Sequence, residues 1–418
     1  MNSSNGYPRI SVVRGPLFEE VRQELSSWAS IVIRVPSDGQ DAQLRYTVGP
    51  IPSDISGGQE VVLRLEADVR NGGTFYTDSN GRDLIKRVVN YRPSWDLIVT
   101  DPVAGNYYPV NAAILIRDSE KQLTVLTDRS LGGTSLREGH IDLMLHRRLV
   151  VDDGRGVDEA LNEQQFGQGM VTRGTFRLGV HDVNVAASWL RGAALRHYQP
   201  LELAFATQIG GRSAWLKSRR GGASGLPNGA QLPPNVALVT LQQLASGAVL
   251  LRLGHLFEVD EDPVLSRLAN VDLRTLFAKK IKAVTEMTLS GNQARSNVQK
   301  LVWRVENEPF SEAPKLRGSP FGRGSFLVEL GPMEIRTFEI IFGNDGPSVH
   351  LSWGLYAGFG IVLLVGGLIM HAAYSWWRGR HKRLPGYHTL SQQSRAADAD
   401  DRRVGTEAEM IEVDSRSP

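Results

Sequence analysis

The sequence predicts an all-β fold of two β-sandwich domains in series, followed by one transmembrane α-helix and a disordered tail. Three observations support this prediction. Short alternating or β-branched runs recur between residues 31 and 342, a Gly/Pro-rich stretch at residues 219–234 divides them into two groups, and one apolar run of about 20 residues lies near the C-terminus. The length of 418 residues leaves room for about two or three domains.

The composition excludes several classes of protein. The chain is 41% hydrophobic and 22% charged, which is ordinary globular usage. Its 47 basic residues against 45 acidic ones give a net charge of +2, so no nucleic-acid partner is predicted. It contains no cysteine, which excludes disulfide staples, cysteine-bound zinc and thiol catalysis by this chain.

The first predicted domain covers residues 1–225. Asn71-Gly72-Gly73 and Asn80-Gly81 are tight-turn or hairpin signals between its strands. The clearest predicted strands are residues 31–35 (IVIRV), 60–69 (EVVLRLEADV), 74–78 (TFYTD), 112–116 (AAILI), 123–127 (LTVLT) and 141–150 (IDLMLHRRLV).

A linker is predicted at residues 226–235, because the surrounding stretch is rich in glycine and proline and lacks apolar periodicity. The second, smaller β-domain follows at residues 236–342. Its predicted strands lie within residues 236–244, 248–259, 301–305 and 325–342.

Residues 351–377 are predicted to span a membrane. Residues 355–374 are apolar over the length that a helix needs, and aromatic residues stand at both ends. Four basic residues follow between 378 and 383, so the positive-inside rule places the tail, residues 378–418, in the cytosol and the domains in the lumen. Residues 1–16 contain no signal-peptide pattern, so we expect the chain to be the C-terminal portion of a longer secretory-pathway protein.

Seven segments carry a family resemblance, which extends from about residue 9 to residue 342. The segments are FYTDSNGR, PVAGNYYPVN, LTVLTDR, HRRLVVDDGRG, LLRLGHLF, VDLRTLF and GPMEIRTF. Together they resemble the C-terminal half of glycoside hydrolase family 38, the lysosomal-type α-mannosidases. The resemblance implies that residues 1–225 form a mutarotase-like β-sandwich, which packs with the smaller β-domain against a catalytic α/β barrel. It also implies hydrolysis of terminal α-linked mannose by a carboxylate nucleophile, an acid/base carboxyl group and a zinc ion, all in that barrel.

No catalytic residue, metal ligand or cofactor is predicted in this chain itself. Its nine histidines show no HExxH or His-x-His spacing, whereas zinc needs three or four converging ligands. Zinc is implied only for the barrel. The chain alone is therefore expected to be inactive, although it resembles a family of enzymes.

The first candidate site is a strand that runs into a turn with charges of both signs. Its guanidinium and carboxylate groups suit sugar hydroxyls or the rim of the barrel, but they equally suit ion pairs that brace the fold. The residues are Arg147, Arg148, Asp152, Asp153 and Arg155.

The second candidate site is Asn106, Tyr107 and Tyr108. Tyrosine rings stack on sugar C–H surfaces, and amides bind sugar oxygens, so these residues are expected to contact a mannose-containing glycan or the barrel. The alternative is that the aromatic pair fills a core or an interface.

Two short motifs concern location. Tyr387 and Leu390 lie in GYHTL, which resembles a lysosomal sorting signal read by an adaptor, and Asn2 begins the one N-glycosylation sequon. We therefore expect a single-pass protein of lysosomes or endosomes. The other function left open is a non-catalytic carbohydrate-binding or receptor-like membrane protein.

Overall fold

The computed structural model describes residues 7–343, except for residues 40, 53–57, 157, 208–209, 220, 223–225, 227–229, 300–316 and 323. These residues belong to one compact unit, Met1–Gly346. No helix within the described ranges is long and apolar enough to cross a membrane. The predicted span and tail, together with Asn2, Tyr387 and Leu390, lie outside them.

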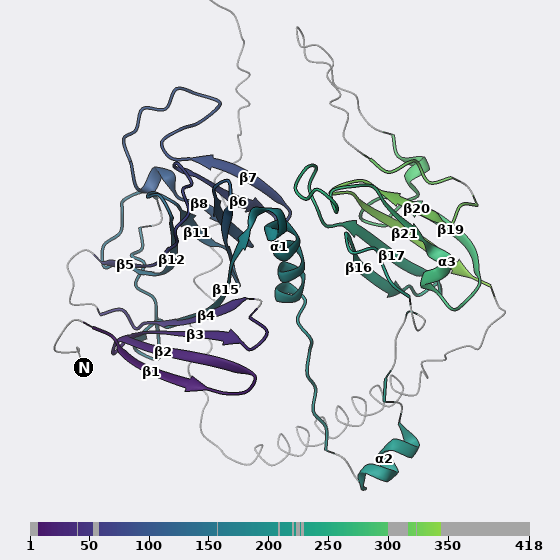
Figure 1. The fold of residues 1–418 in the computed structure, drawn as a ribbon, viewed down its shortest axis with the longest axis horizontal. Coiled ribbons are helices and arrows are strands. Elements are labelled where there is room, and N and C mark those ends of the chain that lie inside the picture. Colours follow the sequence, from purple (N-terminus) through teal and green to yellow (C-terminus); the bar gives the residue numbers. More distant parts are fainter. Residues whose placement is uncertain are drawn as a thin grey trace, which may run out of the picture. The chain divides into compact units, whose positions relative to one another are not determined.

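The first β-sandwich consists of two antiparallel sheets (Figure 1). The larger sheet has nine strands in the order β1 (Arg9–Arg14), β2 (Phe18–Ser26), β3 (Ala29–Pro36), β4 (Ala42–Val48), β15 (Thr172–Asp182), β10 (Lys121–Leu126), β9 (Ala113–Arg117), β6 (Thr74–Ser79) and β7 (Asp83–Val88). The smaller sheet has the order β5 (Gln59–Glu66), β12 (His140–Arg148), β11 (Leu131–Thr134) and β8 (Tyr108–Val110). A two-residue pair, β13 (Gln164–Gln165) and β14 (Gln168–Gly169), lies between β12 and β15 in the chain.

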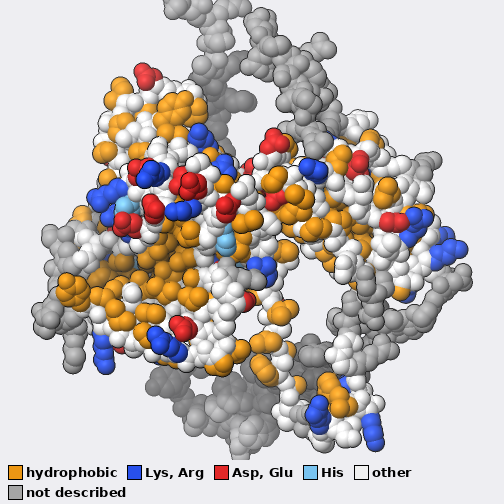
Figure 2. Space-filling view, in the orientation of Figure 1, with side chains coloured by type: hydrophobic (Ala, Val, Ile, Leu, Met, Phe, Trp, Pro, Cys, Tyr) orange, Lys and Arg blue, Asp and Glu red, His pale blue; other side chains and the backbone are white. Residues whose placement is uncertain are grey.

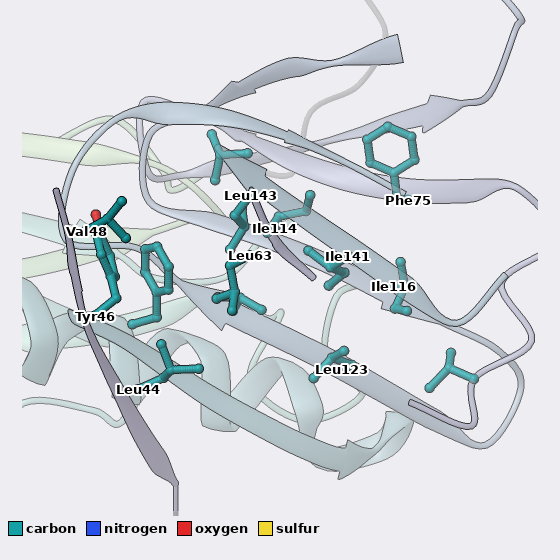
Figure 3. Close-up of a cluster of buried hydrophobic side chains, with 14 of the residues drawn as sticks. Leu44, Tyr46, Val48, Leu63, Phe75, Ile114, Ile116, Leu123, Ile141 and Leu143 are labelled. Carbon is teal, nitrogen blue, oxygen red and sulfur yellow. The ribbon is translucent and has the colours of Figure 1, made fainter. Parts of the chain in front are cut away.

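The core of this sandwich lies between the two sheets, because alternate strand residues point to one face. Figure 3 shows Leu63 and Leu143 of the smaller sheet beside Ile114 of the larger one. Phe75 and Ile141 in the same cluster are fully buried. Burial of each such side chain contributes about 1.5–3 kcal/mol before entropy is counted.

One helix covers the outer face of the larger sheet. Helix α1 (Val183–Tyr198) begins after Asp182, whose side chain accepts a hydrogen bond from the Asn184 backbone N–H at 2.8 Å. Leu190 and Ala193 of α1 pack on the outward side chains of β9 and β10. The sequence did not predict this helix, so the expected all-β class is correct only as mostly β.

The second sandwich is smaller. Its four-stranded sheet has the order β16 (Val236–Gln243), β17 (Val249–His255), β21 (Ile335–Phe342) and β19 (Ile281–Met287), and its two-stranded sheet pairs β18 (Ala269–Asp272) with β20 (Leu327–Leu330). Short helices α2 (Arg212–Ser218) and α3 (Leu273–Leu276) precede β16 and follow β18, and two 3₁₀ turns occupy Ala104–Asn106 and Arg295–Asn297. Leu251, Val328 and Phe338 form the centre of its core, each fully buried.

A network of charged groups joins the two sandwiches. Arg191 of α1 is 7% exposed and donates to Glu261, with Nε 3.0 Å from each carboxylate oxygen, and to Glu258 at 3.3 Å. Arg82, which follows β6, donates to the carbonyl oxygen of His255 at 2.7 Å. The sandwiches are thus joined by specific polar contacts, to which both the helix and the β6–β7 turn contribute.

The strands predicted from the sequence mostly coincide with observed ones, with ends that differ by a few residues. The run at residues 325–342 contains two strands, β20 and β21, rather than one. The predicted strand at residues 301–305 lies outside the described residues. Asn80 and Gly81 form the β6–β7 turn with positive φ angles of 53° and 73°, as a tight hairpin requires.

Candidate functional site

The two arginines of the first candidate site lie at the end of β12 and differ in role. Arg147 is exposed and pairs in register with Glu60 on β5. Arg148 is half-buried, with Nε donating to Asn162 Oδ1 at 2.7 Å and a terminal nitrogen donating to the carbonyl oxygen of Ile51. Arg148 therefore holds two connecting segments against the strand through neutral acceptors, not through the ion pairs considered from the sequence.

The acidic residues that follow are engaged in the turn itself. Asp152 accepts from the Gly154 backbone N–H at 2.7 Å, and Asp153 accepts from the Arg155 backbone N–H at 2.9 Å. These are local Asx-type turns. The Arg155 side chain is exposed and has no hydrogen bond or ion pair to another described residue. Of the charged set, Arg147, Asp153 and Arg155 are exposed, and the two arginines have no side-chain hydrogen bond to another described residue.

Asn106 of the second candidate site is a structural residue. It is 1% exposed, and its side-chain oxygen accepts from the Asn90 backbone N–H at 2.8 Å. Its amide donates to Asn90 Oδ1 at 2.7 Å and to the Pro102 carbonyl oxygen at 2.8 Å. All of its side-chain polar groups are thus satisfied within the loop before β8, which leaves no free group for a sugar.

Tyr107 and Tyr108 lie in different environments. The Tyr108 ring packs edge-on against Phe75, with centroids 5.8 Å apart, and the guanidinium groups of Arg87 and Arg92 lie 4.3 and 5.1 Å from its centroid. A glycan contact through Tyr108 would therefore use its hydroxyl group rather than its face. Burial, with the charge of Asp142 second, raises the pKa of Tyr107 to about 12, so it stays a neutral phenol that can donate a hydrogen bond.

The sheet separates the two candidate sites. Gly133 of β11 pairs with both Tyr108 and Leu143, so the tyrosines lie level with Leu143. Arg148 lies five residues further along β12, which at about 3.3 Å per residue is roughly 15 Å. The structure thus places both sites on one sheet but does not bring them into one cluster.

The sequence reasoning missed an ion pair on the same sheet. Arg64 of β5 donates to both oxygens of Asp142 on β12, at 2.7 and 2.8 Å, and Asp142 is 3% exposed. The strand pattern could have indicated this pair. Arg64 and Asp142 each lie between two core-facing residues of their strand, so both side chains must point to the outer face of the sheet. This pair and Tyr107 form a polar surface on the outer face of the smaller sheet.

The described residues do not fit a metal centre. No group of three or more His, Asp or Glu side chains in this part of the chain is arranged to hold a metal ion. His181, which stands next to Asp182, stacks on Trp189 with ring centroids 4.6 Å apart, so it is a packing residue beneath α1.

Solved structures of two glycosidases have a fold similar to that of this chain. A family 38 glycosyl hydrolase from Enterococcus faecalis aligns with 81% of this chain and 37% of its own, with a TM-score of 0.52 and 13% identity. An α-mannosidase from Enterococcus faecalis V583 aligns with a TM-score of 0.50 and 12% identity. At such low identity the likeness establishes the fold class, that of the β-rich part of a glycoside hydrolase.

Sequence comparison then gives the family. The model of the glycosyl hydrolases family 38 C-terminal domain matches residues 2–155, and that of the family 38 C-terminal β-sandwich domain matches residues 235–338. The chain belongs to glycoside hydrolase family 38, of which it carries the C-terminal domains, and the resemblance seen in the sequence is confirmed.

Named relatives agree with this assignment. An α-mannosidase of Canavalia ensiformis is 44% identical over 338 residues, 79% of this chain and 34% of the relative. The lysosomal α-mannosidase of Bos taurus is 42% identical over 345 residues, 81% of this chain and 34% of the relative. The chain thus spans about a third of the length of the curated relatives it matches.

Proposed function

We propose that this chain is the C-terminal, non-catalytic part of a membrane-anchored α-mannosidase that removes terminal α-linked mannose from glycans and glycoproteins. The observation that carries the proposal is the ordered match of two family 38 C-terminal domains, shared with relatives named as α-mannosidases. About two-thirds of each such relative lies outside the match. On this proposal the nucleophile, the acid/base carboxyl group and the zinc ion belong to that remainder, where the metal would act as a Lewis acid and orient the substrate.

The role of the described sandwiches is then to brace that catalytic part and to complete its rim. Arg147 and Arg155 are accessible on the β12 side, and Tyr107 offers a neutral hydroxyl group on the same sheet. Guanidinium forks and phenol groups suit sugar hydroxyls and carboxylates equally well. Arg148, Asp152 and Asn106 support these residues through hydrogen bonds within the fold, and Asp153 holds the exposed turn through the Arg155 backbone N–H.

The test is a chimera in which this chain's residues 9–342 replace the matched segment of the Canavalia ensiformis α-mannosidase. We expect the chimera to hydrolyse 4-nitrophenyl α-D-mannoside at acid pH, whereas this chain alone does not. Activity of this chain alone would contradict the proposal. A soluble chimera without activity would also contradict it and would favour the carbohydrate-binding alternative, which glycan-array binding by the chain would then support.

We further propose that residues 351–377 anchor the protein in the membrane and that Tyr387 and Leu390 direct it to lysosomes or endosomes. The apolar length, the basic cluster after it and the names of the lysosomal relatives support this. We expect the full chain to resist alkaline carbonate extraction and a 351–377 deletion to be released. We expect Tyr387→Ala to move the protein away from lysosomes, and an unchanged distribution would refute the sorting role.

A further inference from the structure

The segment that follows α1 exposes large apolar side chains in an alternating pattern. Leu201, Leu203 and Phe205 are 94%, 81% and 92% exposed. They alternate with Glu202 and Ala204, so the three would share one face of a strand. Such exposure of three large apolar residues within five positions is unfavourable for a surface that stays in water.

The backbone of the same segment is also unpaired. Residues 201–207 belong to no helix or strand, and none of their backbone groups bonds to another described residue. The segment runs as a plain coil between α1 and α2 in Figure 1, and Figure 2 shows hydrophobic side chains along this stretch in the same view. Unpaired donors and acceptors next to an apolar face are the features of a strand that adds to another sheet.

The energetics favour an apolar partner with an open sheet edge. Burial of the large apolar side chains and formation of new backbone hydrogen bonds would both stabilise a docked strand. Glu202 is the one charged residue between positions 201 and 205, so charge offers little to recognition. Pro200 stands directly before the segment, at a position where proline is compatible with the start of a strand.

We propose that residues 201–205 dock as a β-strand on an open, apolar-faced sheet edge in the part of an α-mannosidase that lies outside the matched third. The proposal rests on the proposed function, because that function supplies the partner. The relatives carry about twice as much chain outside the match as within it, which is enough further chain to supply such an edge. The segment would then be a tether between the sandwiches and the catalytic part.

The experiment compares amide hydrogen exchange at residues 201–206 in this chain alone and in the chimera described above. In the chain alone we expect exchange close to that of an unstructured peptide. In the chimera we expect alternate amides of the segment to slow at least 100-fold, since a docked strand pairs through every second residue.

Two matched substitutions add the same charge to opposite faces of the segment. Leu203→Asp places it on the apolar face and should abolish the slowed exchange and lower the melting temperature of the chimera. Ala204→Asp places it on the other face and should leave both nearly unchanged. Neither variant should alter the melting temperature of the chain alone, where Leu203 is 81% exposed and the segment makes no hydrogen bond to another described residue.

The outcomes separate this inference from the proposed function. An active chimera with fast exchange at residues 201–206 overturns the docking and leaves the function standing. An inactive chimera with slowed alternate amides refutes the function and supports the docking. Slow exchange in the chain alone overturns the docking. If the protection does not depend on protein concentration, the segment pairs with a sheet edge of the same molecule. If the protection increases with concentration, it pairs with a second copy of the chain.

Discussion

At the scale of single residues, the β6–β7 turn shows what a local pattern can and cannot predict. The TDSNG pattern predicts that Asp78 bonds to its own turn, and it does, accepting from the Gly81 backbone N–H at 2.7 Å. The other carboxylate oxygen accepts from three successive N–H groups at residues 111–113, at 2.7–2.9 Å. That second set depends on how β9 meets the turn more than 30 residues away, which no local pattern specifies.

We expect Asp78→Asn to destabilise the first sandwich by about 2–3 kcal/mol. The amide keeps the size of the side chain but directs its N–H groups at backbone donors, which leaves buried donors unsatisfied. Asp78 is 4% exposed, so water cannot replace the lost bonds. Urea unfolding measures the change, with exposed Asp83→Asn on the same hairpin as the control. Equal midpoints for both variants would contradict this account of the turn.

Two charged residues, one at the end of β12 and one after it, differ in whether the fold depends on their side chains. Arg148→Ala should lower the melting temperature by several degrees, because Asn162 and the carbonyl group of Ile51 lose their donor. Arg155→Ala should leave the melting temperature unchanged, since its side chain has no partner among the described residues, yet lower kcat/KM of the chimera if it forms part of the rim. Calorimetry and mannosidase assays measure the two effects. A loss of stability in Arg155→Ala without loss of activity would refute the rim role.

At the scale of elements, the sequence predicted strands well and missed the one long helix. Strands alternate between core and solvent, and that period is visible in runs such as residues 59–66, where Val61, Leu63 and Leu65 of the core alternate with exposed residues. Helix α1 buries mainly small residues, including Ala186, Ala187 and Ala193, so its apolar stripe is weak in the sequence. Its position depends on the outer face of β9 and β10, which is a tertiary property.

A buried carboxylate on β2 gives a pH-dependent prediction. Glu20 is 1% exposed and accepts from Arg34 at 2.7 Å and from Arg22 at 2.7 Å. Hydrogen bonds from Arg34, and then from Arg22, hold the pKa of Glu20 below its usual value near 4.5. A lowered folded-state pKa means that the ionised form stabilises the fold above about pH 4.5 and that this contribution is lost as the pH falls through the lowered value.

We therefore expect Glu20→Gln to lower the free energy of unfolding by about 1 kcal/mol at pH 6, a small value because the arginines are partly exposed to water. This corresponds to a melting temperature that is roughly 2–4 °C lower. The difference should shrink as the pH falls below about 4.5, where the native carboxylate also becomes protonated. Glu24→Gln on the same strand is the control, since its contact with Arg9 is 3.9 Å long and exposed. A pH-independent difference would show that charge is not the cause.

At the scale of the whole molecule, the contacts between the sandwiches could not be predicted from the sequence. Arg191 and Glu261 are 70 residues apart, and neither lies in a pattern that marks an interface. The Gly/Pro-rich stretch predicts a boundary, but not which side chains join the two domains across it. The family resemblance covers both domains and still says nothing of an individual ion pair, because that depends on the packing of α1.

The two glutamates on Arg191 should respond oppositely to neutralisation. Both carboxylate oxygens of Glu261 accept from the Arg191 guanidinium, and both side chains are largely buried. Glu261→Gln should therefore lower the free energy of unfolding by about 2–3 kcal/mol, because it leaves the buried Arg191 charge poorly paired. Burial raises the pKa of Glu258, which means that its charged form is unfavourable in the fold. In the native protein a carboxylate oxygen of Glu258 accepts from the Leu84 backbone N–H at 2.6 Å. Glu258→Gln keeps an oxygen acceptor for this N–H and removes the negative charge.

We expect Glu258→Gln to raise the melting temperature by roughly 1–2 °C at pH 7. A raised folded-state pKa means that the native protein gains stability as the pH falls through that value toward 4.5, whereas the variant does not. The advantage of the variant should therefore vanish near pH 4.5. Calorimetry of both variants between pH 7 and 4.5 measures this. If Glu258→Gln destabilises the chain at pH 7 as much as Glu261→Gln does, the charge of Glu258 stabilises the fold through its ion pair with Arg191, and this account of Glu258 is wrong.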